Sequence, residues 1–343
     1  MINNKNKIFR SHLIASLLVH MNVKIMQGPY IVRELVKKFS PMKYNEKELK
    51  KVTAEVVWNY AVYGFHVDEF FIYDVEGLSD IGKRRFINEE TRWKYYARLN
   101  RKEDEILFDN KMKTYSLFQK YYKRELLFVY SVDKRNEFEA FVKKYSASII
   151  KPLSASGGKG VKLFNQESVE ELLKEYKDGF IVEPRMVNAP EFAEFHKESL
   201  NTVRVVSVRM DDRVEVAYAF ARFGKNGSCI DNARSGGIIS ALDVDSGIVV
   251  AAIDEANKPY IVHPNSGKQI IGFCVPKWNE LRALVEELAQ IVPTTRYIGW
   301  DLALTPEGWT VVEANCKGQF VVQMATKRGL CEQFEAYLKE LET

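Results

Sequence analysis

The sequence predicts an α+β protein in which a helical N-terminal part precedes mostly antiparallel sheets. In the first part, apolar residues recur at helical spacing, whereas from about residue 126 short strand patterns alternate with helix patterns. The glycine content changes as well, with 4 glycines in residues 1–150 and 15 in the remainder. Because glycines mark turns between strands, we expect the two parts to differ in architecture.

The expected elements follow from these patterns in order. The helical run 43–64 ends at a glycine, which suits a helix C-terminus, and 88–105 forms a second helical run. Strands are expected at 126–131, 148–153, 160–164 and 180–186, with helices at 136–145 and 168–176. The later β runs are NTVRVVSVRM, RVEVAYAFARF, GIISALDV, GIVVAAID, IGWDLALT and WTVVEAN, followed by a last helix, QFEAYLKELE.

The overall charge is nearly balanced. The 343 residues carry 50 Lys and Arg against 46 Asp and Glu, a net charge of +4. Nucleic-acid-binding proteins usually carry a larger basic excess, so no nucleic-acid partner is expected. The cysteines at positions 229, 274, 316 and 331 form no C-x-x-C pair, which favours a reducing, cytoplasmic location.

The N-terminal part has a local basic excess, since residues 1–150 hold 28 Lys and Arg against 19 Asp and Glu. We interpret it as a solvated surface, with binding of an anionic polymer or peripheral association with a membrane face as alternatives. The apolar stretch 13–23 is too short to span a bilayer, and no signal-peptide cleavage site follows it.

A run of small residues interrupted only by Lys159, residues 154–160, follows Lys151. Successive small residues expose backbone N–H groups to an anion, so this loop is a candidate phosphate cradle. It differs from a Walker A loop and from a Rossmann turn, because a strand rather than a helix follows it. Neither H-R-D nor D-F-G occurs, which excludes a protein kinase. The pattern predicts a flap over a nucleotide, with an ordinary glycine-rich hairpin as the alternative.

The segment IGWDLALTPEGWTVVEAN predicts a hairpin with a three-residue loop, 306–308. With Thr305 opposite Trp309, Asp301 falls opposite Glu313, and Asn315 lies on the same face. Two facing carboxylates repel each other unless a cation lies between them, and two carboxylates with an amide oxygen suit Mg²⁺. The alternatives are that one carboxylate points to solvent or that Lys317 pairs with it.

Two arginines are expected on strands whose other residues are apolar, Arg204 in NTVRVVSV and Arg222 in VAYAFARF. A buried arginine is costly unless it is paired or faces a ligand. The turn DNARSGG adds Asn232 and Arg234. These groups suit a carboxylate or a transferring phosphoryl group, with internal ion pairs as the alternative.

Taken together, these motifs resemble the ATP-grasp superfamily. The wording of SLNTVRVVSV, DNARSGGI, HPNSGKQIIGFCVPKW and GWDLALT…GWTVVEAN is similar to the sugar-transfer-associated, teichuronopeptide-biosynthesis-like ATP-grasp family over about 105–343. The resemblance implies two α+β subdomains that grip ATP. They are a lysine and flap subdomain, 106–187, and a metal- and substrate-binding subdomain, 188–343, after a mainly helical region, 1–105.

The resemblance also implies roles for individual residues. Phosphates would be contacted by Lys111, Lys151, Ser156, Gly157 and Gly158; adenine by the backbone of Ile181 and Val182, with Glu183 nearby; and ribose by Glu191. Asp301, Glu313 and Asn315 would hold one or two Mg²⁺, with Mn²⁺ as an alternative ion. Arg204, Arg222 and Asn232 would steady the γ-phosphate and an acyl phosphate, and Arg234 would serve the same site or the substrate.

The implied activity is that of an ADP-forming carboxylate–amine ligase. Its substrates would be a small-molecule or glycan-linked carboxylate, such as a uronic-acid sugar, and an amine such as an amino acid. A phosphotransferase acting on a sugar hydroxyl and a non-catalytic nucleotide-binding partner of a glycan-assembly complex are the alternatives. Cys316 is interpreted as a buried filler, and His196 and His263 as structural, with substrate contact as their alternative role.

Overall fold

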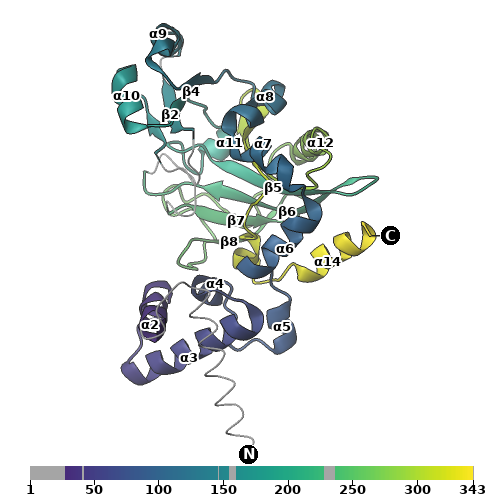
Figure 1. The fold of residues 1–343 in the computed structure, drawn as a ribbon. Coiled ribbons are helices and arrows are strands. Elements are labelled where there is room, and N and C mark those ends of the chain that lie inside the picture. Colours follow the sequence, from purple (N-terminus) through teal and green to yellow (C-terminus); the bar gives the residue numbers. More distant parts are fainter. Residues whose placement is uncertain (1–27, 41, 146, 154–159, 228–235, 343) are drawn as a thin grey trace, which may run out of the picture. The chain divides into compact units, whose positions relative to one another are not determined.

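Figure 1 shows the fold in a computed structural model, which describes residues 28–40, 42–145, 147–153, 160–227 and 236–342. The chain forms two compact units: unit 1, Met1–Arg98 with Gln319–Thr343, and unit 2, Leu99–Gly318. Among the predicted site residues, Ser156, Gly157, Gly158, Asn232 and Arg234 lie outside the described residues.

Unit 1 is helical where it is described. Its helices are α2 (Gly28–Phe39), α3 (Glu46–Tyr63), α4 (Val67–Ile72), α5 (Asp80–Arg84), α6 (Glu89–Leu99, whose last residue is assigned to unit 2), α13 (Val322–Thr326) and α14 (Cys331–Glu340). Asn45 and Glu48 form a capping box at the start of α3, and Gly64 ends it with φ at +82°. The C-terminal segment completes the unit, because the buried Gln323 bonds both backbone groups of Ile87, at 3.0 and 2.8 Å.

Unit 2 begins with the 3₁₀ helix η1 (Lys102–Asp104), α7 (Glu105–Asp109) and α8 (Lys111–Tyr122). A four-stranded antiparallel sheet follows, in the order β1 (Leu127–Val129), β4 (Phe180–Pro184), β2 (Ser148–Pro152) and β3 (Lys162–Leu163). The 3₁₀ helix η2 (Val132–Lys134), α9 (Arg135–Lys144) and α10 (Val169–Glu175) lie between its strands along the chain, and α9 and α10 share its core. The strand expected at 160–164 is confined to two residues in β3.

The second sheet of unit 2 has six antiparallel strands. Its strands are β5 (Thr202–Arg209), β6 (Val214–Phe223), β7 (Ile238–Leu242), β8 (Val249–Ile253), β9 (Tyr297–Thr305) and β10 (Gly308–Asn315), in the order β10-β9-β5-β6-β7-β8. One face packs against α7, α8, α11 (Pro190–Ala193) and α12 (Trp278–Ala289), with Phe118 edge-on to Trp300 at 5.2 Å between ring centroids. Because side chains alternate along a strand, the residues between these apolar ones occupy the other face.

The β9–β10 hairpin corrects one prediction and preserves another. Thr305 lies opposite Gly308 rather than Trp309, so the turn is tighter than expected. A bulge between Val311 and Glu313 then adds one residue to β10 and restores the predicted pairing of Glu313 with Asp301. The bulge is therefore what brings Glu313 to the same face as Asp301.

Candidate active site

Four neighbouring strands place polar side chains on the face of the six-stranded sheet opposite to the one that packs against α7, α8, α11 and α12. Arg204 on β5 lies opposite Asp301 on β9, and Asp301 lies opposite Glu313 on β10. Thr202, two residues before Arg204, lies opposite Arg222 on β6. The strand register thus gathers residues that are about one hundred positions apart in the sequence.

Asp301 is the centre of this group. It is 3% exposed, and the Nη2 of Arg204 donates to its Oδ2 at 2.6 Å, while the Nε of Arg204 donates to Oδ1. The Nη2 of Arg222 lies 2.8 Å from Oδ1. Burial alone would raise the pKa of Asp301, but the two guanidinium groups hold that pKa below its ordinary value. The arginines therefore make the internal ion pairs that were the alternative to direct ligand binding.

The space around Arg204 depends on two glycines. A Cβ atom added at Gly299 or at Gly318 would lie 3.2 Å from the Nη1 of Arg204. The second arginine, Arg222, is oriented differently, because its Nε and Nη2 donate to the hydroxyl of Thr202 at 2.9 and 2.7 Å. Both guanidinium groups are thus fixed in direction by their surroundings.

Glu313 and Asn315 differ from Asp301 in their contacts. Glu313 is half-buried, and it makes no hydrogen bond or ion pair with another residue that the structure describes. The Oδ1 of Asn315 accepts a bond from the backbone N–H of Lys317 at 2.8 Å. The ammonium of Lys317 pairs with Glu105 at 2.7 Å and with Asp109 at 3.2 Å, both on α7. The structure therefore contradicts the alternative that Lys317 neutralises the hairpin carboxylates.

The lysines of the predicted phosphate site lie on other elements of unit 2. Lys151 on β2 forms an ion pair with Glu183 on β4. Lys111 is the first residue of α8, and burial lowers its pKa, an effect that the charge of Glu313 opposes and that of Lys151 reinforces. Lys111 therefore lies within the electrostatic reach of both the lysine end and the carboxylate end of the site.

The residues predicted to contact adenine and ribose lie on β4 and α11. Ile181 and Val182 lie between β1 and β2, and each is paired in both ladders, so their backbone groups already face neighbouring strands. Glu183 and Pro184 pair with β2 but not with β1. From Glu183 onward, the edge of β4 that faces away from β2 therefore has no strand partner. Glu191 is exposed on α11.

A model of sugar-transfer-associated ATP-grasp proteins matches residues 90–339. The chain belongs to this ATP-grasp family. A search of the curated proteins finds no match. The family assignment agrees with the resemblance inferred from the motifs and with the two antiparallel sheets of unit 2.

Among solved structures, the chain is similar to the ATP-grasp ligase PsnB bound to a minimal precursor, with 13% identity, a TM-score of 0.46, and coverage of 71% of this chain and 63% of that one. Another complex of PsnB contains Mg and ADP. A RiPP-associated ATP-grasp ligase from Chryseobacterium gregarium shows 14% identity, a TM-score of 0.42, and coverage of 87% and 70%. An L-amino acid ligase from Bacillus licheniformis shows 12% identity, a TM-score of 0.38, and coverage of 63% and 42%. The chain thus spans less than two thirds of the length of PsnB.

The oxygen atoms at the carboxylate end of the candidate site are of the kind that a hard divalent cation prefers. The described residues contain no group of three or more His, Cys, Asp or Glu side chains arranged for a metal. The predicted ligands are two carboxylates and one amide, those of Asp301, Glu313 and Asn315. Each carboxylate oxygen has two lone pairs. Hydrogen bonds from the two arginines occupy both lone pairs of Oδ1 and one lone pair of Oδ2 of Asp301. The lone pairs left for a cation are the second one of Asp301 Oδ2, those of the Glu313 carboxylate, and the second one of Asn315 Oδ1. This set suits Mg²⁺, which retains waters and takes phosphate oxygens as further ligands.

Arg124, whose side chain is buried near the candidate site, is not among the residues predicted from the sequence. It lies between α8 and β1 and donates to Glu183 and to the backbone of β10. In the sequence it follows Lys123, and such a basic pair after a helix is typical of a solvated surface. Its partners are far away along the chain, so nothing in the local pattern indicates burial.

The histidines and Cys316 have structural surroundings. His196 Nδ1 lies 2.9 Å from the hydroxyl of Ser199, and His263 Nε2 lies 2.8 Å from the carbonyl oxygen of Gly224, all of them buried or nearly so. Burial raises the pKa of the Cys316 thiol to about 12, so it is protonated at neutral pH and unsuited to nucleophilic attack.

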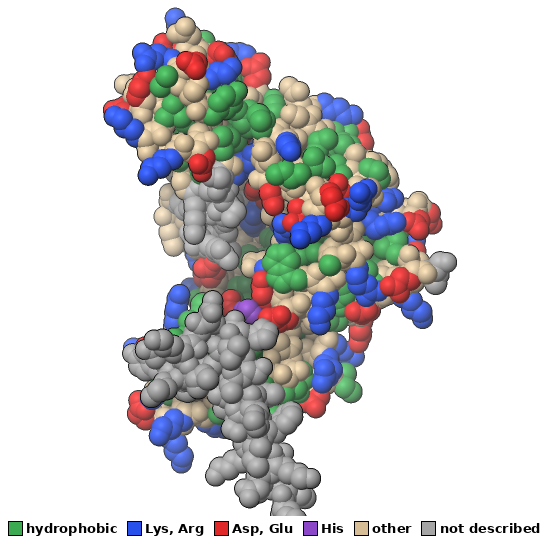
Figure 2. Space-filling view, in the orientation of Figure 1, with side chains coloured by type: hydrophobic (Ala, Val, Ile, Leu, Met, Phe, Trp, Pro, Cys, Tyr) green, Lys and Arg blue, Asp and Glu red, His purple; other side chains and the backbone are tan. Residues whose placement is uncertain are grey.

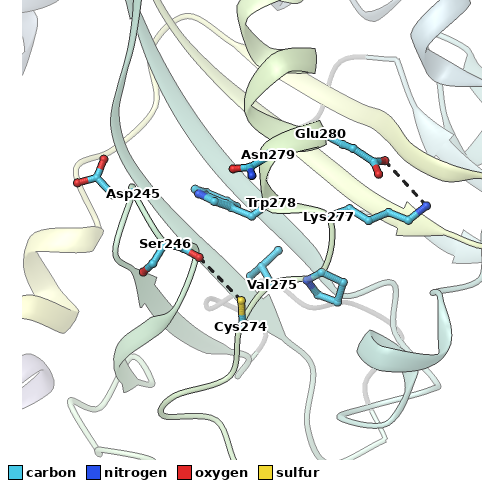
Figure 3. A pocket seen from close by; sticks show the side chains of 9 residues that line it. Asp245, Ser246, Cys274, Val275, Lys277, Trp278, Asn279 and Glu280 are labelled. Atoms are coloured by element: carbon cyan, nitrogen blue, oxygen red, sulfur yellow. Dashed lines mark hydrogen bonds and ion pairs between the residues drawn. The ribbon is translucent and has the colours of Figure 1, made fainter.

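An open cavity of about 590 Å³ lies at the start of α12 (Figure 3), and its lining includes the ion pair between Lys277 and Glu280. Trp278 and the exposed Cys274 line it, and the Sγ of Cys274 lies 3.8 Å from the carbonyl oxygen of Ser246. None of the residues that line it belongs to the group around Asp301.

Two further observations concern the distribution of surface charge and the apolar length of the described helices. Figure 2 shows Lys and Arg side chains interspersed with Asp and Glu over the visible face of unit 2. Within residues 28–342, apart from the internal gaps, no helix is long and apolar enough to cross a membrane.

Proposed function

We propose that the protein is an ATP- and Mg²⁺-dependent, ADP-forming carboxylate–amine ligase that acts through an acyl phosphate. The observation that carries this proposal is the juxtaposition, on one sheet face, of two paired arginines, Asp301 and the carboxylate of Glu313, with Lys111 within electrostatic reach. Family membership adds the expectation of nucleotide binding. The proposed substrates are a uronic-acid sugar or another carboxylate of a cell-surface glycan precursor, and an amino acid or other amine.

In the proposed reaction, an oxygen of the substrate carboxylate attacks the γ-phosphorus of ATP and ADP leaves. The amine then attacks the carbonyl carbon of the acyl phosphate, releases phosphate and loses a proton as the amide forms. A bound Mg²⁺ supplies charge neutralisation for the phosphates. Asp301, Glu313 and Asn315 would hold it, Lys111 and Lys151 would bind phosphate oxygens, and Arg204 and Arg222 would present guanidinium hydrogens to the charge that develops on the transferring group.

The other predicted roles stay part of the proposal. Ser156, Gly157 and Gly158 would cover the phosphates, Asn232 and Arg234 would complete the substrate end, and Glu191 would bind ribose. The predicted contact of adenine with the backbone of Ile181 and Val182, with Glu183 nearby, also stays a proposal. The subdomain boundaries at 106–187 and 188–343 likewise stay predictions.

The test is a turnover assay with Mg-ATP, a mixture of uronic acids and amino acids, and hydroxylamine as a surrogate amine. ADP, AMP, free phosphate and hydroxamate are measured separately. We expect ADP with an equal amount of free phosphate and a hydroxamate. ADP formed with the phosphate retained on a sugar hydroxyl would contradict the ligase and establish a phosphotransferase, whereas AMP would contradict acyl-phosphate chemistry.

A further inference from the structure

Arg124 connects the two sheets of unit 2. Its side chain is 6% exposed. Its Nη1 donates to the carbonyl oxygen of Val311 on β10 at 2.8 Å and to that of Tyr122 at 3.1 Å. Its Nε and Nη2 donate to the Oε2 of Glu183 on β4 at 3.1 and 2.9 Å. The guanidinium group also lies over the ring of Tyr122, at 4.9 Å from the centroid. Arg124 is thus held on three sides.

Glu183 has a second cationic partner. Its Oε1 pairs with the ammonium of Lys151, whose side chain is 19% exposed, whereas that of Glu183 is 3% exposed. Burial alone would raise the pKa of Glu183, but Arg124 and Lys151 hold that pKa below its ordinary value. The carboxylate therefore stays charged in a place where an uncompensated charge is very unfavourable.

The two cations of Glu183 differ in what they are able to do. Arg124 is fixed by four hydrogen bonds and a ring contact, whereas Lys151 is a point charge on a flexible stem. In the proposed function, Lys151 binds a nucleotide phosphate. If Lys151 were the sole partner of Glu183, its move to the phosphate would leave a buried negative charge without a counter-ion, and this would weaken nucleotide binding.

We infer that Arg124 is a positioning residue for nucleotide binding: it keeps Glu183 compensated, so that Lys151 is released from Glu183 to a phosphate of the nucleotide. This inference rests on the proposed function. It predicts that the effect of removing Arg124 depends on whether residue 183 carries a charge. A purely structural role for Arg124 predicts no such dependence.

The experiment measures the affinity of the full chain for ADP with Mg²⁺, by isothermal titration calorimetry, in four variants. Arg124→Met should weaken binding about ten- to hundredfold, because Glu183 then competes with the phosphate for Lys151. Arg124→Met combined with Glu183→Gln should bind within about threefold of the wild type, since the neutral amide needs no counter-ion. Arg124→Lys, which keeps the charge, should bind more tightly than Arg124→Met. Glu183→Gln alone is the reference for the double variant.

Arg135→Met is the matched control, because Arg135 is 54% exposed and pairs with Glu170 on the surface of the same sheet region. It should bind ADP like the wild type. Circular dichroism and thermal melting establish that each variant is folded, and Arg124→Lys carries the comparison if Arg124→Met is not.

The outcomes separate the inference from the proposed function. Two results overturn the inference and leave the proposed function standing, provided that the wild type binds ADP. One is that Arg124→Met binds ADP as tightly as Arg124→Lys does, and the other is that adding Glu183→Gln to Arg124→Met does not restore the affinity. If the wild type binds no ADP with Mg²⁺, the proposed function itself is overturned. Weak binding by Arg124→Met with rescue by Glu183→Gln supports the inference.

Discussion

Asp301 and Glu183 are both buried carboxylates between two cations, yet their cations differ. Asp301 is held by two arginines of its own sheet, Arg204 and Arg222. Glu183 is held by one arginine from a link between the sheets and by one lysine. Guanidinium groups in fixed geometry lock a carboxylate, whereas an ammonium changes partners more easily. The comparison indicates that Asp301 is a permanent part of the site and that Glu183 is able to give up one of its cations.

The largest expected effect comes from removing the permanent charge. Asp301→Asn leaves two largely buried guanidinium groups without a carboxylate, so we expect a loss of about 3–5 kcal/mol in the free energy of unfolding and a loss of turnover. Denaturant unfolding checks the first and the ADP-release assay the second. The control is Asp211→Asn, whose exposed carboxylate pairs with Arg296 and should change stability by less than about 1 kcal/mol. Equal stability of Asp301→Asn and the wild type would break the comparison.

Glu313→Gln should affect turnover without affecting the fold. Glu313 has no direct partner among the described residues, and the change removes a predicted metal ligand and relieves its repulsion with Asp301. We expect turnover with Mg-ATP to fall at least about a hundredfold, with an unchanged unfolding midpoint. Glu307→Gln, at the exposed tip of the same hairpin, should retain full turnover. Full activity of Glu313→Gln would remove the metal-site assignment.

Gly299→Ala tests whether the position of the Arg204 guanidinium matters. The added Cβ would lie 3.2 Å from Nη1 and 3.3 Å from Cδ, so the side chain has to shift. We expect turnover to fall about tenfold, since small displacements of a positioned group are costly. Gly82→Ala in α5, where the nearest atom is 3.4 Å from the new Cβ, serves as the control. Unchanged kinetics of Gly299→Ala would show that the exact position of Arg204 is unimportant.

The pH dependence of the free energy of unfolding should reflect the two buried carboxylates, Asp301 and Glu183. Their pKa values are held below the ordinary values of 3.8 and 4.5, so the folded state binds fewer protons than the unfolded state. Their contribution to stability is therefore present above about pH 4.5 and is lost as the pH falls through the lowered pKa values. Denaturant unfolding between pH 6 and pH 3.5 should show a steeper decline for the wild type than for Glu183→Gln. Parallel declines would contradict this assignment.

The smallest expected effect is that of Cys316→Ala. With its pKa near 12, the thiol takes no part in the chemistry, so turnover should stay within about twofold of the wild type. The lost sulfur should lower the free energy of unfolding by about 1 kcal/mol. A loss of turnover comparable to that of Glu313→Gln would instead point to a covalent step.

The hairpin shows how far the sequence predicts this site and why it goes no further. The pairing of Asp301 with Glu313 was predicted correctly, but two errors in the prediction cancel. The turn is one residue shorter than predicted, and a bulge in β10, which no residue pattern in that strand indicates, restores the register. The arginine strands were predicted too, whereas the partner of both arginines was left open, because it depends on strand order rather than on spacing. Arg124 was missed for the same reason.

The division of unit 1 between two distant stretches of chain has a consequence for biosynthesis. Gln323, which bonds both backbone groups of Ile87, is synthesised only after the whole of unit 2, Leu99–Gly318, has been made. At 5–20 residues per second, that interval is roughly 10–40 s. During this interval, helices α2 to α6 lack the C-terminal segment that completes unit 1. We therefore expect unit 2 to be the first part of this protein to reach its final structure on the ribosome.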